Sequence, residues 1–336
     1  MLICERFERK ILAALENCSP DTIFLVAVSG GADSMAMLAA LSQFPNYSCF
    51  HVEHGIRPAE ESRGDAEFVR AFCEKQGIKF CVKHIPPGKV AAYAKRKGIG
   101  IEAAARFFRH KALSAEAARL GKNTRILIAH TKDDALELSL MRFLRGSGPA
   151  GLAAMPESRG RILRPLLGLT RADVIGYLKA KGIPWREDAS NADEKFLRNK
   201  IRRRLVPLLD EAFPSWRTGV SAVAQTQSLA AEFIVSEADK RIKWESQETS
   251  LSTETQNFFA QPPIIREEAI FLAIDELLKN VKSPRSVKRT VVRQFCSGSV
   301  TAADLGSVRI KRETGRITLS REKKEFFETG ISTLIK

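Results

Sequence analysis

A glycine- and serine-rich loop near the N-terminus carries the clearest chemical signal in the sequence. Six consecutive residues form it: Ser29, Gly30, Gly31, Ala32, Asp33 and Ser34. Glycine lets the backbone turn tightly and leaves its N–H groups open to an anion. The serine hydroxyls add donors, and the helical pattern that starts at once adds the partial positive charge of a helix N-terminus. The loop is therefore predicted to bind phosphate.

Asp33 is the unexpected member of this loop because a carboxylate repels a phosphate. A Mg²⁺ ion between the two groups would remove the repulsion, so Asp33 is a candidate metal ligand. The alternative is an ordinary strand–turn–helix junction in which Ser-Gly-Gly only makes the turn. The loop matches neither G-x-x-x-x-G-K-[ST] nor G-x-G-x-x-G, so a P-loop NTPase and a dinucleotide-binding dehydrogenase lack support.

The elements that must position this loop follow from the pattern of the first half of the chain. Short apolar runs alternate with segments that have apolar residues at helical spacing. Near-continuous apolar strands between helices predict a parallel sheet covered on both faces. We therefore expect an α/β fold with a doubly wound parallel sheet of about five strands, and ligands beyond the carboxyl ends of the strands. The runs are Ile23–Val28, Ser48–Val52, Phe80–Ile85, Arg125–Ala129 and Arg161–Leu167.

The pattern changes near residue 210, and a smaller α-helical or α+β domain is expected beyond it. Helical spacing covers Pro214–Trp244, Arg266–Lys279 and Ser286–Phe295, and a polar linker extends from the first of these helices to Gln261. Alternating residues in 307–312 and 316–320, around a Glu-Thr-Gly turn, predict a small hairpin. The predicted domains are residues 1–212, which carry the loop, and residues 213–336.

The charge of the chain indicates a polyanionic partner. Lys and Arg outnumber Asp and Glu by 54 to 39, which gives a formal charge of +15. Such an excess favours nucleic acid, because each neutralised phosphate releases counterions. No apolar run approaches the roughly 18 residues that a membrane span needs, so we expect a cytoplasmic protein without a membrane partner. The six cysteines include no C-x-x-C pair, and we interpret them as thiols in a reducing compartment.

The loop sequence S-G-G-x-D-S after a first strand resembles the PP-loop signature of the N-type ATP pyrophosphatases. This resemblance implies an adenine nucleotide α-hydrolase-like fold and ATP as a cofactor. It also implies cleavage between the α- and β-phosphates, so that a substrate becomes adenylated.

Further segments resemble the tRNA(Ile)-lysidine synthetase family over residues of about 20 to 210. These segments are His51–Arg57, Glu102 with Arg106 and Arg109, Ala129–Asp134, Arg145–Leu152, Trp185–Asn191 and Arg198–Arg202. The chain departs from the family pattern at Thr131, where a second histidine is usual, and at His110, where a tyrosine is usual. The longest family members carry a further C-terminal domain, which we expect to be absent here.

The resemblance implies a two-step reaction on a CAU-anticodon isoleucine tRNA, with free L-lysine as the second substrate. Oxygen 2 of the wobble cytosine attacks the α-phosphate of ATP, and the lysine ε-amine then attacks carbon 2. A homodimer is a further expectation. The candidate catalytic residues are Asp33, Asp133, Asp134, Arg106 and Arg202. The candidate ATP-binding residues are the six loop residues and Val52, and the candidate Mg²⁺ ligands are Asp33 and Asp134.

Several of these side chains have a structural alternative. Asp134 and Glu137 also fit a capping box that opens a helix, whereas function would give them Mg²⁺, lysine or a proton to bind. Arg109 and Arg198 are candidates for neutralising phosphates of ATP or tRNA. His51 and His54 lie either beside the adenine or in the core. In the second domain, tRNA backbone contacts are expected at Arg285, Lys288, Arg289 and Arg293.

Three other functions remain open at this point. A tRNA thiolase of the same superfamily is the nearest, although such enzymes commonly carry paired cysteines. A small-molecule amidating synthetase fits the strong positive charge less well. A non-catalytic tRNA-binding protein of the same fold is the third, because the segment that follows His130 is altered.

Overall fold

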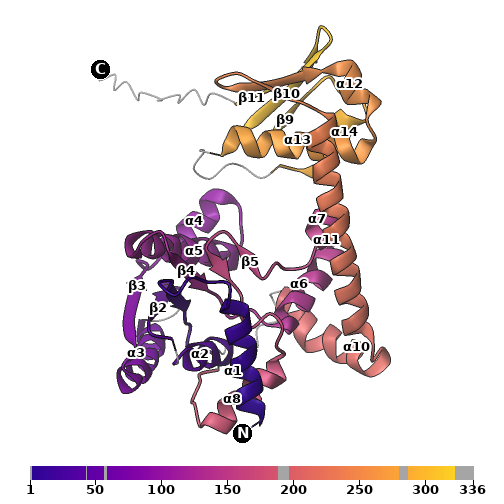
Figure 1. Ribbon diagram of the computed structural model, residues 1–336. Helices are drawn as coiled ribbons and strands as arrows, with labels where there is room; N and C mark the ends of the chain where they lie inside the picture. The colour runs from indigo at the N-terminus through magenta and orange to yellow at the C-terminus, as the bar shows by residue number, and fades with distance from the viewer. Residues whose placement is uncertain (1, 43, 57–58, 188–196, 280–286, 322–336) are drawn as a thin grey trace, which may run out of the picture. The chain divides into compact units, whose positions relative to one another are not determined.

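The computed structural model describes residues 2–42, 44–56, 59–187, 197–279 and 287–321 (Figure 1). The chain divides into two compact units, Met1–Gln225 and Thr226–Lys336. The division falls within helix α11 (Trp216–Arg241), whereas the sequence places the domain boundary just before that helix. In the described residues no helix combines the length and the apolar character that crossing a membrane requires.

The first unit is built on one mixed sheet of the predicted kind. Its strand order is β3-β2-β1-β4-β6-β5, in which β1, β2, β3, β4 and β6 are parallel and the edge strand β5 is antiparallel. The expected fold class is therefore confirmed. The strands are β1 (Ile23–Ala27), β2 (Tyr47–Glu53), β3 (Lys79–His84), β4 (Thr124–Leu127), β5 (Ser158–Arg159) and β6 (Ile162–Leu163).

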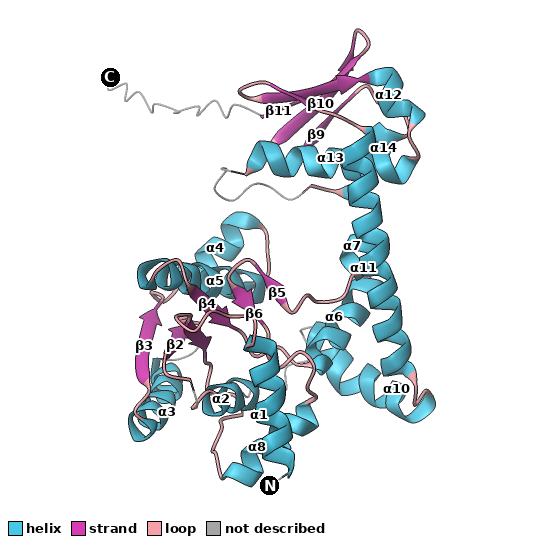
Figure 2. Cartoon of the chain, viewed as in Figure 1, coloured by secondary structure: helices cyan, strands magenta, loops and turns pink. Residues whose placement is uncertain are grey.

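Helices connect these strands and cover the sheet (Figure 2). In chain order they are α1 (Leu2–Leu15), α2 (Ala32–Ala40), α3 (Ala59–Gln76), α4 (Lys89–Lys97), α5 (Ile101–Leu120), α6 (Lys132–Leu144), α7 (Pro149–Leu152), α8 (Arg171–Lys181), α9 (Leu197–Lys200) and α10 (Val206–Ala212). A π-helical segment, Ile201–Leu205, joins α9 to α10. Helix α5 leads into β4 by a short turn and therefore runs antiparallel to it, so its N-terminal half lies toward the carboxyl ends of the strands.

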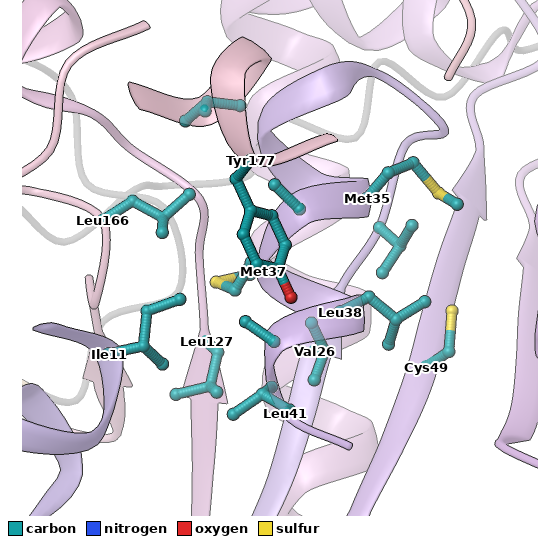
Figure 3. Packing of buried hydrophobic residues seen from close by; sticks show 14 of the residues in the cluster. Ile11, Val26, Met35, Met37, Leu38, Leu41, Cys49, Leu127, Leu166 and Tyr177 are labelled. Atoms are coloured by element: carbon teal, nitrogen blue, oxygen red, sulfur yellow. The ribbon is translucent and has the colours of Figure 1, made fainter. Parts of the chain in front are cut away.

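A large apolar core fixes the helix that follows the loop. Met35 and Leu38 of α2 are fully buried in it (Figure 3). The rings of Phe7 from α1 and Tyr177 from α8 stack there with their centroids 4.3 Å apart. A second apolar cluster, with Leu113 of α5, covers another part of the sheet. Since close packing leaves little freedom in such a core, the start of α2 has a fixed place at the end of β1.

The second unit has a sheet and core of its own. Its antiparallel strand order is β7-β8-β11-β10-β9, and one face packs on helix α13 through residues such as Leu251, Ile310 and Leu319. The strands are β7 (Glu245–Ser246), β8 (Ser250–Glu254), β9 (Ala302–Leu305), β10 (Val308–Glu313) and β11 (Arg316–Arg321). The helices are α12 (Thr255–Ala260), α13 (Pro263–Leu278) and α14 (Arg289–Cys296).

Two sequence predictions for this unit have different outcomes. The hairpin is confirmed, because β10 pairs with β11 around Thr314 and Gly315, whose φ angles of 46° and 79° suit a tight hairpin turn. The linker that was expected up to Gln261 is wrong. Strands β7 and β8 and helix α12 occupy that stretch, and β8 pairs with β11, which lies more than sixty residues further along the chain. A partner so distant leaves no signal in a local window of sequence.

Candidate active site

The glycine- and serine-rich loop lies where β1 ends and α2 begins, as expected. Gly30 has a φ of +91°, a left-handed conformation that glycine adopts without strain. Gly31 is the N-cap of α2, and no side chain caps its first turn. Inside the loop, Ser34 Oγ donates to the Gly31 carbonyl at 2.9 Å and accepts from the Ser29 N–H at 3.2 Å. The loop therefore presents the N-terminus of α2 in the form that favours an anion.

Asp33 stands in the first turn of α2 with its two oxygens in different situations. Oδ2 forms an ion pair with Arg171, the first residue of α8. Oδ1 is buried, and no described group hydrogen-bonds to it. Burial raises the pKa of Asp33, the neighbouring Arg171 opposes that rise, and the charge of Asp134 adds to it. A buried carboxylate oxygen without a partner is costly and suits a hard cation such as Mg²⁺.

Asp134 opens helix α6 as part of a capping box, although not the one expected from the sequence. The N-cap is Thr131, whose hydroxyl accepts from the Asp134 N–H at 3.3 Å, while Asp134 Oδ2 accepts from the Thr131 N–H at 2.8 Å. The predicted box between Asp134 and Glu137 is therefore wrong, because the helix starts three residues earlier. Thr131, a departure from the family pattern, is a good N-cap residue.

Glu137 takes no part in the cap of α6 and belongs to an ion-pair cluster instead. Its side chain is only 5% exposed, and it accepts from Arg198 Nε at 2.9 Å and from Arg202 Nε at 2.6 Å. The same two arginines reach Asp134 Oδ1, at 2.5 Å and 3.4 Å. Arg198 and Arg202 are four residues apart across the start of the π-helical segment. We call Asp134, Glu137, Arg198 and Arg202 the acid–arginine quartet.

Asp133 lies apart from this quartet. Its Oδ2 accepts from the backbone N–H of Arg171 at 2.7 Å, and its Oδ1 lies 4.0 Å from Nε of Arg217. Asp133 thereby joins the start of α6 to the start of α8, the helix whose Arg171 also pairs with Asp33. Asp133 and Asp134, although adjacent in sequence, therefore have different neighbours.

Four arginines, from α5, α6 and the segment after β6, form a second group of charges that are coupled through Arg106. This arginine cluster consists of Arg106, Arg109, Arg142 and Arg164. Partial desolvation lowers the pKa of each of them, and that of Arg109 falls to about 10. Their mutual repulsion adds to the effect, because Arg106 lowers the pKa of the other three.

Two histidines lie among these arginines and are uncharged at neutral pH. Desolvation lowers the pKa of His110 to about 4, and the positive charges of Arg106, Arg109 and Arg164 add to that shift. Desolvation also lowers the pKa of His130 to about 4, although the charge of Asp134 opposes it. Tyrosine is usual at position 110 in the family that the sequence resembles, so a neutral polar side chain is retained there.

The other residues predicted for the site have varied surroundings. Val52 is half-buried on β2, beside the apolar clusters around Leu25 and Val90. His51 is buried, and its Nδ1 lies 2.8 Å from the Val28 carbonyl oxygen, so it joins the ends of β1 and β2 as a core residue. Asp188, Ser190 and Asn191 of the Trp185–Asn191 segment, and Arg285, lie outside the described residues.

The basic residues expected to contact tRNA from the second unit have partners within that unit. Arg289 lies 3.3 Å from Glu267 and 3.7 Å from Glu268, and its guanidinium stacks over the ring of Phe271. Arg293 lies 3.1 Å from Glu267. A large part of their charge is therefore balanced locally. Their predicted tRNA contact stays a prediction.

Sequence reasoning missed Arg171, Arg164 and Arg217. A signal existed for Arg171, because it follows the N-cap Thr170 and the last apolar run of the sheet, on the side where ligands bind. Arg164 directly follows β6, within the run that was predicted as strand, and was therefore expected to be core. Nothing in the sequence links Arg217 to Asp133.

A comparison with protein-family models finds a match to the PP-loop domain over residues 3–209. The chain belongs to the PP-loop family. The loop between β1 and α2 is thus part of the PP-loop domain that the sequence predicted. The match also ends close to the expected end of the first domain.

Curated relatives of this PP-loop chain include tRNA(Ile)-lysidine synthases. The protein from Treponema denticola is 38% identical over 253 residues, which are 72% of this chain and 55% of that protein. The one from Solibacter usitatus is 38% identical over 288 residues, which are 84% of this chain and 59% of that protein. The chain therefore spans a little more than half the length of these relatives.

Among solved structures, the U34-tRNA thiolase NcsA from Methanococcus maripaludis, solved with its [4Fe-4S] cluster, has the same fold. Its TM-score is 0.54 at 16% identity, and the match covers 69% of this chain and 80% of that one. At this identity the likeness shows a shared PP-loop fold and nothing about substrate.

Proposed function

We propose that this chain ligates free L-lysine to carbon 2 of the wobble cytidine in a CAU-anticodon isoleucine tRNA, at the expense of ATP. ATP would be cleaved between its α- and β-phosphates, and pyrophosphate and AMP would be released. The observation that carries the proposal is the loop with its buried Asp33 oxygen, close enough to the acid–arginine quartet for Asp134 and Arg202 to act on the pKa of Asp33. The tRNA(Ile)-lysidine synthases among the relatives support the choice of substrates.

In the first step the loop would hold the pyrophosphate part of ATP. The first-turn amides of α2 and the hydroxyls of Ser29 and Ser34 point to this role. When bound, Mg²⁺ supplies positive charge to the phosphate oxygens. Asp33 would hold this ion through its unpartnered Oδ1. The other loop residues carry no charge and offer only backbone amides and hydroxyls. Oxygen 2 of the cytosine bonds to the α-phosphorus, and the bond to the pyrophosphate oxygen breaks.

Asp134 fits Mg²⁺ less directly than Asp33 does. Both of its oxygens are engaged, Oδ2 by Thr131 and Oδ1 by the two arginines of the quartet. Among the described residues, no group of three or more His, Cys, Asp and Glu side chains could hold a metal by itself. We therefore assign the metal to Asp33 together with the phosphates of ATP, and keep Asp134 as a ligand only if its arginines move away.

In the second step the quartet suits an amino acid with a charged side chain. Carboxylates at Asp134 and Glu137 would attract the ε-ammonium of lysine, while Arg198 and Arg202 would attract its α-carboxylate. The ammonium has an ordinary pKa of about 10.4, so a carboxylate must accept its proton before attack. The amine nitrogen then bonds to carbon 2, the bond from carbon 2 to oxygen 2 breaks, and AMP leaves with that oxygen.

Arg106 and the remaining catalytic candidate, Asp133, have less direct roles in this proposal. Arg106 is close enough to Arg198 for the two charges to repel each other, so it can neutralise an α-phosphate that lies between them. Asp133 would hold α8 in place through the Arg171 amide. Arg171 would then keep Asp33 oriented until Mg²⁺ binds.

The rival functions are less well supported by the same residues. A thiolase commonly uses paired cysteines of the C-x-x-C kind, which this chain lacks. Cys49 and Cys73 are neighbours, but both are fully buried in the apolar core. A binding protein without catalysis needs no buried, unpartnered carboxylate oxygen in its phosphate loop. The substrates of a small-molecule synthetase would not require the formal charge of +15.

The experiment that tests the proposal is pyrophosphate release from ATP in the presence of isoleucine tRNA transcripts. One transcript carries the CAU anticodon and a matched one carries uridine at the wobble position, each with and without free lysine. Release that depends on the cytidine, with lysine found in the tRNA, is the expected result. Release that ignores the tRNA would mean a small-molecule synthetase, and no release would favour a binding protein.

A further inference from the structure

The segment that follows α8 reaches back to the phosphate loop. The backbone N–H of Arg186 donates a hydrogen bond to the Gly30 carbonyl oxygen at 3.0 Å. Trp185, the residue before it, is half-buried and packs against the apolar core that also holds α2. The loop is therefore held from outside by a residue that lies far along the chain, in a segment to which the proposed chemistry gives no role.

This hydrogen bond fixes the peptide between the two glycines of the loop. The C=O and the N–H of a planar trans peptide point in opposite directions, so the bond to the Gly30 carbonyl also fixes the direction of the Gly31 N–H. That N–H reaches Ser29 Oγ only at 3.4 Å, a weak hydrogen bond that leaves it available to a phosphate. A peptide between two glycines meets little steric resistance to rotation. Without the Arg186 bond it could turn over and present a carbonyl oxygen in place of the N–H.

The side chain of Arg186 anchors its own backbone to helix α3. Its Nε lies 3.1 Å from Oδ1 of Asp65, whose side chain is 16% exposed, whereas the arginine side chain is 45% exposed. The neighbouring Gly64 leaves room for the guanidinium, because a side-chain carbon there would lie 3.1 Å from Arg186 Nη1. The ion pair thus holds Arg186 at a defined place along α3.

Helix α3 also supports the loop directly. Gly30 is buried against it, since a side-chain carbon on Gly30 would lie 3.5 Å from Val69 Cγ2 and 3.7 Å from Phe68 Cδ1. One helix therefore supports both the loop and the residue that fixes the glycine peptide. Movement of Arg186 away from α3 would loosen the loop without disturbing the apolar core beneath it.

We propose that Arg186 is a positioning residue for ATP. Its backbone N–H holds the Gly30–Gly31 peptide in the orientation that offers the Gly31 N–H to a phosphate, and its ion pair with Asp65 keeps that backbone in reach. The inference rests only on the ATP-binding part of the proposed function, because the loop is positioned in the same way whatever substrate becomes adenylated. Arg186 acts through Gly30 and not on the reacting atoms.

ATP binding to the full chain, measured by calorimetry with Mg²⁺ and without RNA, tests this role. Arg186→Gln and Asp65→Asn each break the ion pair and are expected to raise the dissociation constant for ATP by up to about fivefold. The double variant should lose no more than either single one, because both remove the same interaction. Arg186→Lys keeps the charge and should recover part of the affinity. Glu67→Gln is the matched control, because Glu67 lies on the same helix and pairs with Arg70 at the surface.

Arg186→Pro removes the backbone donor itself. The dissociation constant for ATP is expected to rise about tenfold. In assays of pyrophosphate release, the KM for ATP should rise by the same factor with kcat unchanged, because the loop amide binds the ground state and the transition state alike. If the proline variant does not fold, the ion-pair variants decide the question.

The outcomes separate this role from a structural one. Unchanged ATP affinity in Arg186→Gln and Asp65→Asn, even with a lower melting temperature, would make the pair structural and overturn the proposal. A fall in kcat at constant KM for ATP would also overturn it. ATP affinity that responds to these variants, in a protein that releases no pyrophosphate with the tRNA transcripts, would support the role of Arg186 and refute the proposed function.

Discussion

At the scale of single residues, the candidate site contains polar groups that folding removes from water at a cost in free energy. Asp33 is a carboxylate with one oxygen buried and unpartnered, and His110 and His130 are imidazoles that lose their charge among arginines. Each arrangement lowers the stability of the chain by itself. Such costs persist where a ligand compensates them, so they mark a binding site more clearly than any well-satisfied group does.

Replacing Asp33 separates function from stability. We expect Asp33→Asn to reduce pyrophosphate release at least about a hundredfold, and to raise the melting temperature of the unliganded protein by a few degrees. The gain arises because the amide carries no buried charge. It should shrink as the pH is lowered through the raised pKa of Asp33, where the native carboxyl also becomes neutral. A melting temperature below that of the parent chain would contradict this account.

The two histidines predict a loss of stability in mild acid. In the unfolded chain they titrate near 6.5, whereas in the folded chain their pKa values are about 4. Between these values the unfolded state binds protons that the folded state does not, so stability falls as the pH drops from 6.5 toward 4. The double variant His110→Asn with His130→Asn should lose less stability than the parent over that range, measured by thermal melts. Parallel curves would exclude the histidines as the cause.

At the scale of elements, helix α6 carries the site through its first two turns. Thr131 and Asp134 cap the helix, and one turn later Glu137 faces the arginines of α9 and the π-helical segment. The wider turn of a π-helix changes the direction of the side chains that follow it, and such segments are frequent at functional sites. The cap at Thr131 therefore fixes the position of Asp134. The arginines of α9 and the π-helical segment neutralise the charge of Glu137.

Breaking the Glu137 pair tests this coupling of elements. Glu137→Ala leaves Arg198 and Arg202 with Asp134 as their remaining partner in the quartet, and we expect it to destabilise the protein by about 2 kcal/mol. Glu116→Ala is the control, because its pair with Arg119 is on the surface and contributes less than about 1 kcal/mol. Both are measured by chemical denaturation. Equal effects of the two substitutions would show that the quartet adds nothing beyond a surface ion pair.

At the scale of the whole molecule, two separate cores accompany two kinds of sheet. One apolar cluster is centred on α2 and the parallel strands, and the other on α13 and the antiparallel strands. The PP-loop match covers only the first. Function is therefore expected to be unevenly distributed, with the ATP chemistry in the first unit. The expected homodimer stays a prediction.

Calorimetry of the full chain with ATP and Mg²⁺ examines this division. Two unfolding transitions are expected, one for each core, and only the transition of the first unit should move upward with the ligand. At a ligand concentration about a hundred times the dissociation constant, the stabilisation is about 2.7 kcal/mol. A single transition, or two that move together, would mean that the units unfold as one.

The sequence alone determined the parts of this protein that depend on neighbouring residues. The loop from Ser29 to Ser34, the alternation of strands and helices, and the final hairpin are all local patterns, because periodicity and turn chemistry act over a few residues. The family resemblance added the expected reaction and the candidates beyond the loop, among them Asp133 and Asp134.

Only the tertiary structure decided what these candidates contact. Arg171 reaches Asp33 across 138 residues, and Arg202 reaches Glu137 across 65. In the same way, β8 of the second unit obtains its hydrogen bonds from β11, which is distant in sequence. The local sequence of β8 therefore predicts a linker rather than a strand. The physical reason is the same in each case. A side chain or a strand edge acquires its charge balance or its hydrogen bonds from groups that only folding brings near, and no local window of sequence contains them.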